Sequence, residues 1–167
     1  GSASFAADVM GRITGTPGFC IATLGPGATN LATGVGSAYL DRSPMIAVTC
    51  NLNTPQLGRR IQMWIDHHAL FAPITKASYA VKHDNVAEIM KEAITLALTE
   101  PMGPVHIDLP EDVSLAPAKG TVNASFSVTH LETTASDADI KKAIDLLEKA
   151  QKPVAILGSS AMRMKDH

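Results

Sequence analysis

Short apolar runs alternate with segments of helical spacing along the first 110 residues. Four apolar runs predict buried strands, and they cover residues 19–24, 45–50, 77–82 and 105–109. Three further segments repeat their apolar residues at helical spacing, and they predict helices over 3–14, 28–41 and 85–99. Strands that alternate with helices pair in parallel, so the pattern predicts an α/β fold. We expect a doubly wound parallel sheet with helices on both faces.

Particular residues mark the ends of these elements. Phe5, Val9 and Ile13 recur every four residues in the first helix, and Gly15 is expected to end it. Asp84 is the expected N-cap of the helix over 85–99. The less regular stretch between the second and third strands predicts a loop, with a short helix within 65–71.

A change of composition predicts the domain organisation. Residues 1–115 form the first domain, and residues 116–135 read as a linker because they are rich in Ser, Thr, Ala and Pro. Ser136 is expected to cap a helix that opens a second, incomplete domain over 136–167. The apolar run 154–158, VAILG, predicts a strand in that domain.

Composition and charge exclude several classes of protein. Hydrophobic residues make up 46% of the chain and charged residues 18%, so a packed core is expected instead of disorder. The net charge is −2 without a basic stripe, which argues against nucleic acid, and no apolar run is long enough to span a membrane. Cys20 and Cys50 lie inside apolar runs, and we interpret them as small core residues of a cytoplasmic protein.

The segment TLGPGATN, residues 23–30, follows the first strand and opens the next helix. Gly25 and Gly27 permit backbone conformations closed to other residues and leave room for close approach. Free amides at the start of a helix favour an anion or a polar group, and open α/β sheets bind ligands at the carboxyl ends of their strands. The segment therefore predicts a binding loop, with a tight strand–helix turn as the alternative.

Several motifs occur in the order found in one enzyme family. TLGPGATNL, AYLDRSPMIAVT, PITK and EPMGPVHIDLPEDV together resemble the pyrimidine-binding domain of thiamine-diphosphate (ThDP) enzymes, and acetolactate synthases most of all. The resemblance covers about residues 3–115. Residues 137–158 are similar to the start of the Rossmann-like central domain of the same enzymes.

The resemblance also implies where the catalytic acid lies. In this family a glutamate contacts N1′ of the aminopyrimidine and helps to remove the C2 proton of the cofactor. Ala3, Ala7 and the segment Gly11–Gly15 match the residues that follow this glutamate. The spacing places the glutamate immediately before Gly1, so we expect no catalytic residue within these 167 residues, from which the first strand is also expected to be missing.

The family's cofactor contacts fall on the TLGPGATN segment. Pro26 and Asn30 are expected near the aminopyrimidine, with Gly25 and Gly27 shaping the approach. Acetolactate synthases place a glutamine three residues before the aspartate that corresponds to Asp66. Here that position is Met63, and Gln62 is one residue out of register, so both are weaker candidates for cofactor contact.

The remaining cofactor contacts would come from outside this sequence. The diphosphate and its Mg²⁺ are held in the family by a GDG motif on another domain, which the partner subunit supplies, and no metal ligand is expected here. The resemblance therefore implies a homodimer or homotetramer with the active site between subunits. Some acetolactate synthases also bind FAD on the central domain.

Two classes of function follow from these expectations. The first is part of a ThDP-dependent carboligase that condenses 2-oxo acids such as pyruvate with loss of CO₂, with a ThDP-dependent decarboxylase or related lyase as the close alternative. Such a part alone would be inactive. The second is a non-catalytic, dimerising α/β module.

The other ionisable residues are interpreted as structural or surface residues. Adjacent residues on a helix do not share a face, so His67 and His68 are expected at a surface or an interface. Asp108 is interpreted as a capping or solubilising residue. Arg59 and Arg60 are assigned to a solvated loop, and Lys76 is placed at the sheet edge close to the site.

Overall fold

The computed structural model describes residues 1–117, 134–158 and 161. The chain divides into two units, Gly1–Leu131 and Glu132–His167, and each is described by itself.

A four-stranded parallel sheet forms the centre of the first unit. Its strands run in the order β1-β2-β4-β3, and every pair is parallel. Their bounds are Gly18–Ala22 for β1, Met45–Asn51 for β2, Ser78–Ala80 for β3 and Pro104–Pro110 for β4. All four strands predicted from apolar runs are present, so the predicted α/β class with a parallel sheet is confirmed.

The helices of this unit connect and flank the strands. They are α1 Ser2–Thr14, α2 Pro26–Leu40, α3 His67–Phe71, α4 Val86–Leu98 and α5 Glu111–Leu115. Two 3₁₀ turns occupy Thr54–Gln56 (η1) and Ala72–Ile74 (η2). The N-cap of α4 is Asn85 and not Asp84 as predicted. Its side-chain oxygen accepts a hydrogen bond from the backbone N–H of Lys82 at 2.7 Å, which fixes the turn before the helix.

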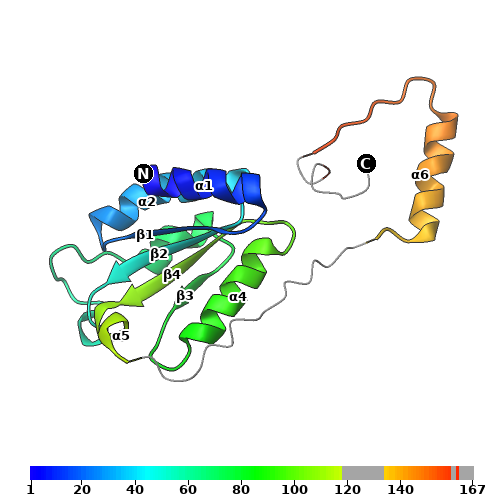
Figure 1. Ribbon diagram of the computed structural model, residues 1–167. Coiled ribbons are helices and arrows are strands. Elements are labelled where there is room, and N and C mark those ends of the chain that lie inside the picture. Colours follow the sequence, from blue (N-terminus) through cyan, green and yellow to red (C-terminus); the bar gives the residue numbers. More distant parts are fainter. Residues whose placement is uncertain (118–133, 159–160, 162–167) are drawn as a thin grey trace. The chain divides into compact units, whose positions relative to one another are not determined.

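Side chains from alternate positions of β2 build a core on each face of the sheet. Met45 and Ala47 pack with buried residues of α1 and α2, whereas Ile46 and Val48 pack with Ala93 and Ala97 of α4 and with β4. Figure 1 shows α1 and α2 on one side of the sheet and α4 on the other. Helices therefore cover both faces, as predicted.

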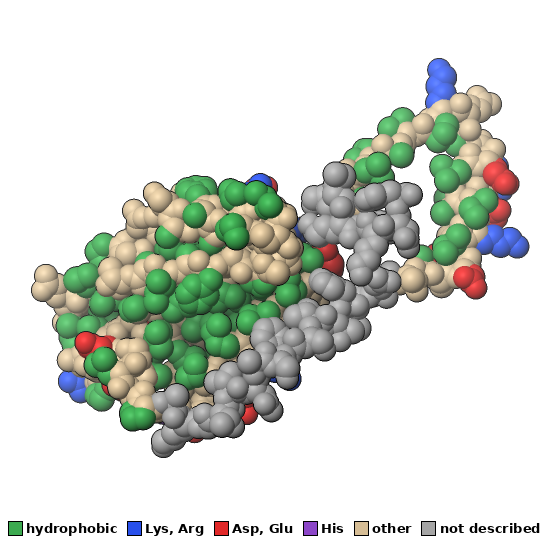
Figure 2. Space-filling model, in the orientation of Figure 1, with side chains coloured by type: hydrophobic (Ala, Val, Ile, Leu, Met, Phe, Trp, Pro, Cys, Tyr) green, Lys and Arg blue, Asp and Glu red, His purple; other side chains and the backbone are tan. Residues whose placement is uncertain are grey.

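Helix α1 is present as predicted, but it packs through its small residues. Ser4, Ala7, Asp8 and Gly11 are its buried positions. Phe5, Val9 and Ile13, whose spacing predicted the helix, are 44%, 51% and 78% exposed. Green hydrophobic side chains accordingly lie on the surface over α1 in Figure 2. The helix packs through small residues because it lies very close to Pro44. A Cβ on Gly11 would lie 2.3 Å from the carbonyl oxygen of Pro44.

The cysteines are both free thiols. Cys20 lies in the core with 4% exposure, and burial raises the pKa of its thiol to about 11. It is an inert core residue, as predicted, since a reactive thiol needs an accessible thiolate.

The second unit contains helix α6, Asp137–Lys149. Ser136 caps it as predicted, since its hydroxyl accepts a hydrogen bond from the Asp139 N–H at 3.2 Å. The strand predicted over residues 154–158 is wrong, because these residues form no regular structure. A strand needs a ladder partner, and the described part of this unit contains no other strand. The domain boundaries stay a prediction, and residues 118–133 of the predicted linker lie outside the described residues.

None of the helices in the described ranges is long and apolar enough to cross a membrane.

Candidate functional site

The TLGPGATN segment forms the turn between β1 and α2 at the carboxyl end of β1. Gly25 is the N-cap of α2, with φ +59° and ψ −111°, and Pro26 is the first helical residue. Proline suits this position because its ring presets the helical φ and its missing N–H would have no partner inside the helix. The carbonyl of Gly25 accepts a hydrogen bond from Thr29 N–H at 3.0 Å, which closes the first turn.

The structure gives its own reason for the two glycines. A Cβ on Gly25 would lie 2.1 Å from the carbonyl oxygen of Met63, and a Cβ on Gly27 would lie 2.6 Å from the Thr23 methyl group. Backbone atoms therefore close the position at Gly25, where glycine is required, whereas a Cβ at Gly27 would have to displace the exposed Thr23 side chain. Their part in holding a cofactor stays a prediction.

Two of the predicted contact residues face solvent at this turn. Pro26 and Asn30 are exposed, whereas Gly25 is buried beneath them. Gly1 lies beside Asn30, since a Cβ on Gly1 would be 3.4 Å from Asn30 Oδ1. The start of α1 and the start of α2 thus meet at the residues assigned to the aminopyrimidine.

The structure separates Met63 from Gln62. Met63 has a positive φ of 68°, and its backbone packs directly against Gly25. Its side chain is 43% exposed. Gln62 is exposed in the same loop. Of the two weaker candidates, the structure thus brings the backbone of Met63 against the predicted binding loop.

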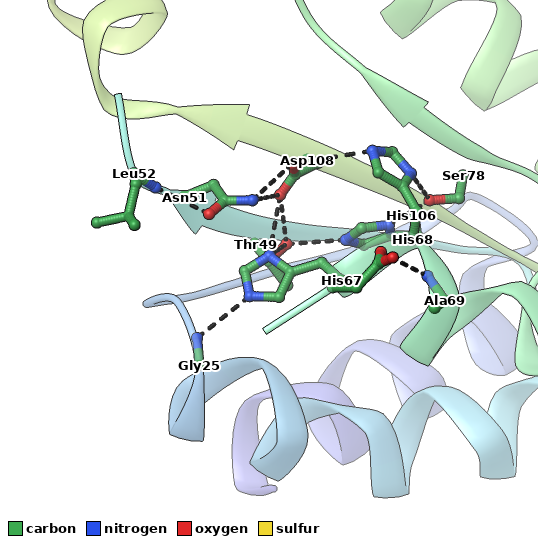
Figure 3. A network of polar contacts seen from close by, with 11 residues as sticks. Gly25, Thr49, Asn51, Leu52, His67, His68, Ala69, Ser78, His106 and Asp108 are labelled. Atoms are coloured by element: carbon green, nitrogen blue, oxygen red, sulfur yellow. Dashed lines mark hydrogen bonds and ion pairs between the residues drawn. The ribbon is translucent and has the colours of Figure 1, made fainter. Parts of the chain in front are cut away.

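A buried polar cluster lies beneath this loop, at the carboxyl ends of the two central strands. Thr49 and Asn51 belong to β2, and Asp108 belongs to β4, where it is the direct neighbour of Thr49. All three are at most 5% exposed. Asn51 Nδ2 donates to both carboxylate oxygens of Asp108, at 3.0 and 2.8 Å (Figure 3). Sequence reasoning assigned Asp108 to capping or solubility, and this was wrong.

His67 joins the cluster from helix α3. It is 1% exposed, so the predicted surface or interface position is wrong. Its Nδ1 lies 3.0 Å from Asp108 Oδ1 and 3.0 Å from Thr49 Oγ1, and its Nε2 accepts a hydrogen bond from Gly25 N–H at 3.2 Å. The ring therefore bridges the sheet and the binding loop. Adjacent histidines on a helix point in different directions, and here His67 points into the protein whereas His68 is partly exposed.

A second line of polar groups continues across the sheet. His106 Nε2 lies 2.8 Å from Thr49 Oγ1, and His106 Nδ1 lies 2.7 Å from Ser78 Oγ. Ser78 in turn lies 2.6 Å from Nδ1 of His68, whose side chain is 43% exposed. Phe71 stacks on the His106 ring with the centroids 4.3 Å apart. Throughout the described residues, no buried side-chain nitrogen or oxygen lacks a hydrogen-bond partner.

One signal in the sequence could have revealed this cluster. In the segment VHIDLP, polar residues alternate with apolar ones inside a strand expected to be buried on both faces. Because alternate residues share a face, His106 and Asp108 had to lie on the same side of the sheet. Two ionisable groups on one buried face require partners, and those partners come from β2 and α3.

Burial and hydrogen bonds shift the pKa values of this cluster. Burial is the largest influence on Asp108 and raises its pKa, but hydrogen bonds from His67 and Asn51 outweigh it and hold the pKa below 3.8. Burial lowers the pKa of His106 to about 3, against a smaller opposite effect of the Asp108 carboxylate. At neutral pH the cluster therefore contains an ionised Asp108 and a neutral His106.

The lowered pKa of His106 predicts that acid begins to destabilise the fold at a higher pH than the range in which carboxylates normally titrate. Unfolded His106 binds a proton below its ordinary pKa of 6.5, whereas folded His106 does so only near 3. The contribution of neutral His106 to the free energy of unfolding is therefore fully present above pH 6.5. Between pH 6.5 and about pH 3, the free energy of unfolding should fall by up to about 1.4 kcal/mol for each pH unit. Urea unfolding at pH 7.5, 5.5 and 4.5 measures this slope. The variant His106→Asn, which cannot titrate, should show a shallower slope, and equal slopes would contradict the assignment.

Three other predicted positions lie apart from this cluster. Lys76 is at the opposite, amino-terminal end of the sheet, where its backbone N–H bonds to Pro104, so the prediction that it lies near the site is wrong. Its Nζ donates to the carbonyls of Leu96 and Thr99 at the end of α4, 2.6 Å from each. Arg59 and Arg60 are exposed in their loop, as predicted. The described part of the chain contains no group of His, Cys, Asp and Glu side chains arranged to hold a metal ion.

Comparisons with known proteins agree with this architecture. Residues 1–70 match the family described as thiamine pyrophosphate enzyme, N-terminal TPP binding domain. The probable acetolactate synthase large subunit of Methanocaldococcus jannaschii is 37% identical over 167 residues, which cover 96% of this chain and 28% of the relative. The acetolactate synthase isozyme 2 large subunit of Escherichia coli is 38% identical over 157 residues, 93% of this chain and 28% of the relative.

The chain resembles the thiamine pyrophosphate (ThDP) enzymes, as its motifs predicted, and its residues 1–70 match the N-terminal domain of that family. Within that class it is similar to acetolactate synthase large subunits, and it spans less than a third of the length of the relatives described above.

Proposed function

We propose that this chain is part of a ThDP-dependent carboligase of the acetolactate synthase type, which condenses 2-oxo acids such as pyruvate with loss of CO₂. The 167 residues alone would be inactive. The whole enzyme would be a cytoplasmic homodimer or homotetramer with its active site between subunits.

The observation that carries this proposal is the position of the TLGPGATN loop. It lies at the carboxyl end of β1, where open α/β sheets bind ligands, and His67 holds it from below. Gly1 lies beside Asn30, so a glutamate preceding Gly1 would start next to the same loop. The similarity of 37–38% to acetolactate synthase subunits supports the reaction class.

The residues present fit the pyrimidine half of ThDP. The exposed Pro26 ring offers an apolar surface, and the exposed amide of Asn30 offers both a donor and an acceptor for an aminopyrimidine edge. ThDP would supply the carbanion chemistry that 2-oxo acid cleavage requires. Its diphosphate and Mg²⁺ would be held by residues outside this chain, and FAD would bind, if the enzyme uses it, on the central domain.

Pyruvate turnover by a full-length protein that contains this chain tests the proposal. The reaction contains ThDP and Mg²⁺, and acetolactate and acetaldehyde are quantified separately. Acetolactate as the main product supports the carboligase. A matched reaction without ThDP is the control and should form neither product.

Met63 leaves one alternative outcome to be tested. Its backbone packs against Gly25, and it stands where acetolactate synthases would place a glutamine, so a Met63 side chain directed at the substrate would make the reacting side of the pocket less polar. Acetaldehyde as the main product would replace the carboligase with a ThDP-dependent decarboxylase. If the protein binds ThDP but does not turn over pyruvate, the proposed substrate is wrong and a different one must be sought. If the protein does not bind ThDP, a non-catalytic module is favoured.

A further inference from the structure

The buried contact between Gly25 and His67 joins two segments 42 residues apart. Gly25 is the N-cap of α2, and His67 is the first residue of α3. Both residues are buried, so water does not compete for this hydrogen bond. In a low-dielectric setting an unpaired amide is costly, which makes the contact a strong constraint on the turn.

The chemistry of the contact fixes the tautomer of His67. A backbone N–H can only donate, so Nε2 must accept and cannot carry a proton. A neutral imidazole must then carry its proton on Nδ1, which lies 3.0 Å from Asp108 Oδ1 and 3.0 Å from Thr49 Oγ1. An ionised carboxylate only accepts, so Asp108 is a suitable partner for that proton.

The partners of Asp108 hold the ring in one orientation. Asn51 donates to both carboxylate oxygens and so fixes the plane of the carboxylate. On the other side, Asp66 caps α3 by accepting a hydrogen bond from Ala69 N–H at 2.9 Å, which fixes the backbone of His67. The ring is therefore positioned at its backbone and at Nδ1 before it reaches Gly25.

We propose that His67 is a positioning residue for the cofactor loop. The sheet, through Asp108, sets the Nδ1–H tautomer, and the free Nε2 then anchors the amide of Gly25 and with it the exposed residues Pro26 and Asn30. The anchor itself is independent of any ligand, but its role towards the aminopyrimidine rests on the proposed function.

Nitrogen NMR of the unmodified chain tests the anchor directly. Long-range ¹H–¹⁵N spectra distinguish a protonated from an unprotonated ring nitrogen, and a merely space-filling histidine need not adopt either tautomer. At pH 7.5 the expected result for His67 is a protonated Nδ1 and an unprotonated Nε2. A protonated Nε2, with or without a protonated Nδ1, would overturn the proposal.

Two variants separate the nitrogens of the ring. In His67→Gln the amide oxygen reaches the position of Nε2 and can accept from Gly25, whereas in His67→Asn the amide nitrogen occupies the position of Nδ1 and Gly25 loses its acceptor. Hydrogen exchange at the Gly25 amide should accelerate about fivefold or more in His67→Asn and less in His67→Gln. His83→Asn, at an exposed histidine, is the control and should leave the rate unchanged. Equal exchange rates in all three variants would overturn the anchor.

The same variants in a full-length protein test the role towards the cofactor. The ThDP concentration for half-maximal activation should rise about fivefold or more in His67→Asn and less in His67→Gln. Unchanged ThDP dependence in His67→Asn would overturn the positioning role and leave the proposed function standing. Absence of ThDP binding by the unmodified protein would instead overturn the proposed function, and with it the role towards the cofactor, whatever tautomer His67 adopts. If His67→Asn does not fold, the tautomer measured on the unmodified chain still decides the anchor.

Discussion

Replacing Gly25 with alanine should lower the free energy of unfolding by about 2–6 kcal/mol. Roughly 1–3 kcal/mol comes from forcing a residue with a Cβ into a positive-φ conformation, and a similar amount comes from overpacking. The added Cβ would meet the carbonyl oxygen of Met63 at 2.1 Å and its carbonyl carbon at 3.0 Å. These are backbone atoms, so no side-chain rotation can relieve the clash, and the segment around Met63 must move. Urea unfolding at pH 7.5 measures the loss.

A second glycine with a positive φ shows what such a substitution costs without the contact. Gly15 also has a positive φ, +66°, but nothing lies within 4 Å of the position that its Cβ would take. Gly15→Ala should therefore show only the conformational cost of about 1–2 kcal/mol. If Gly25→Ala proves no more destabilising than Gly15→Ala, then the packing of Met63 against the turn does not constrain it.

The periodic elements of this chain could be predicted because their signals are local. Four apolar runs gave four strands, and the parallel pairing followed from their alternation with helices. The face of α1 could not be predicted in the same way. Its buried side is made of Ser4, Ala7, Asp8 and Gly11, because α1 lies close to α2 and to Pro44, and small residues allow that approach. Large apolar residues such as Phe5 were left outside.

The short strand β3 and the strand predicted over 154–158 show the limit of apolar runs as evidence. Both runs are apolar, yet Ser78–Ala80 pairs with β4 whereas residues 154–158 have no strand partner among the described residues. Strand formation depends on a neighbour distant in the sequence, and a run of valine and isoleucine does not show whether that neighbour exists.

Of the two parts of the candidate site, the loop could be predicted from the sequence and the buried cluster could not. The glycines, the proline and the position after a buried strand identified the loop, because each acts on the local backbone. The cluster beneath the loop joins residues 25, 49, 51, 67 and 108, which only the completed sheet brings together. A rule about adjacent residues placed His67 at the surface, since it says nothing of which direction is inward. The alternation in VHIDLP was the available clue.

Replacing Asp108 with alanine should cost about 3–5 kcal/mol, because it leaves buried donors without an acceptor. The side chain of Asp108 accepts from Asn51 Nδ2, from His67 Nδ1 and, at 3.3 Å, from the Thr49 hydroxyl. Water has little access to these donors, since Asp108 is 2% exposed and His67 is 1% exposed. Urea unfolding at pH 7.5 gives the magnitude. Asp112→Ala is the control, because Asp112 is only partly buried and accepts a hydrogen bond from Thr54 N–H, so the loss of stability should be smaller.

The pH dependence of the same variant shows whether the charge itself is responsible. The folded pKa of Asp108 lies below its ordinary 3.8, so the carboxylate stabilises the fold above that value and the contribution disappears as the pH falls through the folded pKa. Below about pH 4 the unmodified protein should therefore lose stability more steeply than Asp108→Ala. Parallel curves in that range would mean that Asp108 acts by shape alone. The Nδ1–H tautomer of His67 would then lack its acceptor, and the loop would need another explanation for its position.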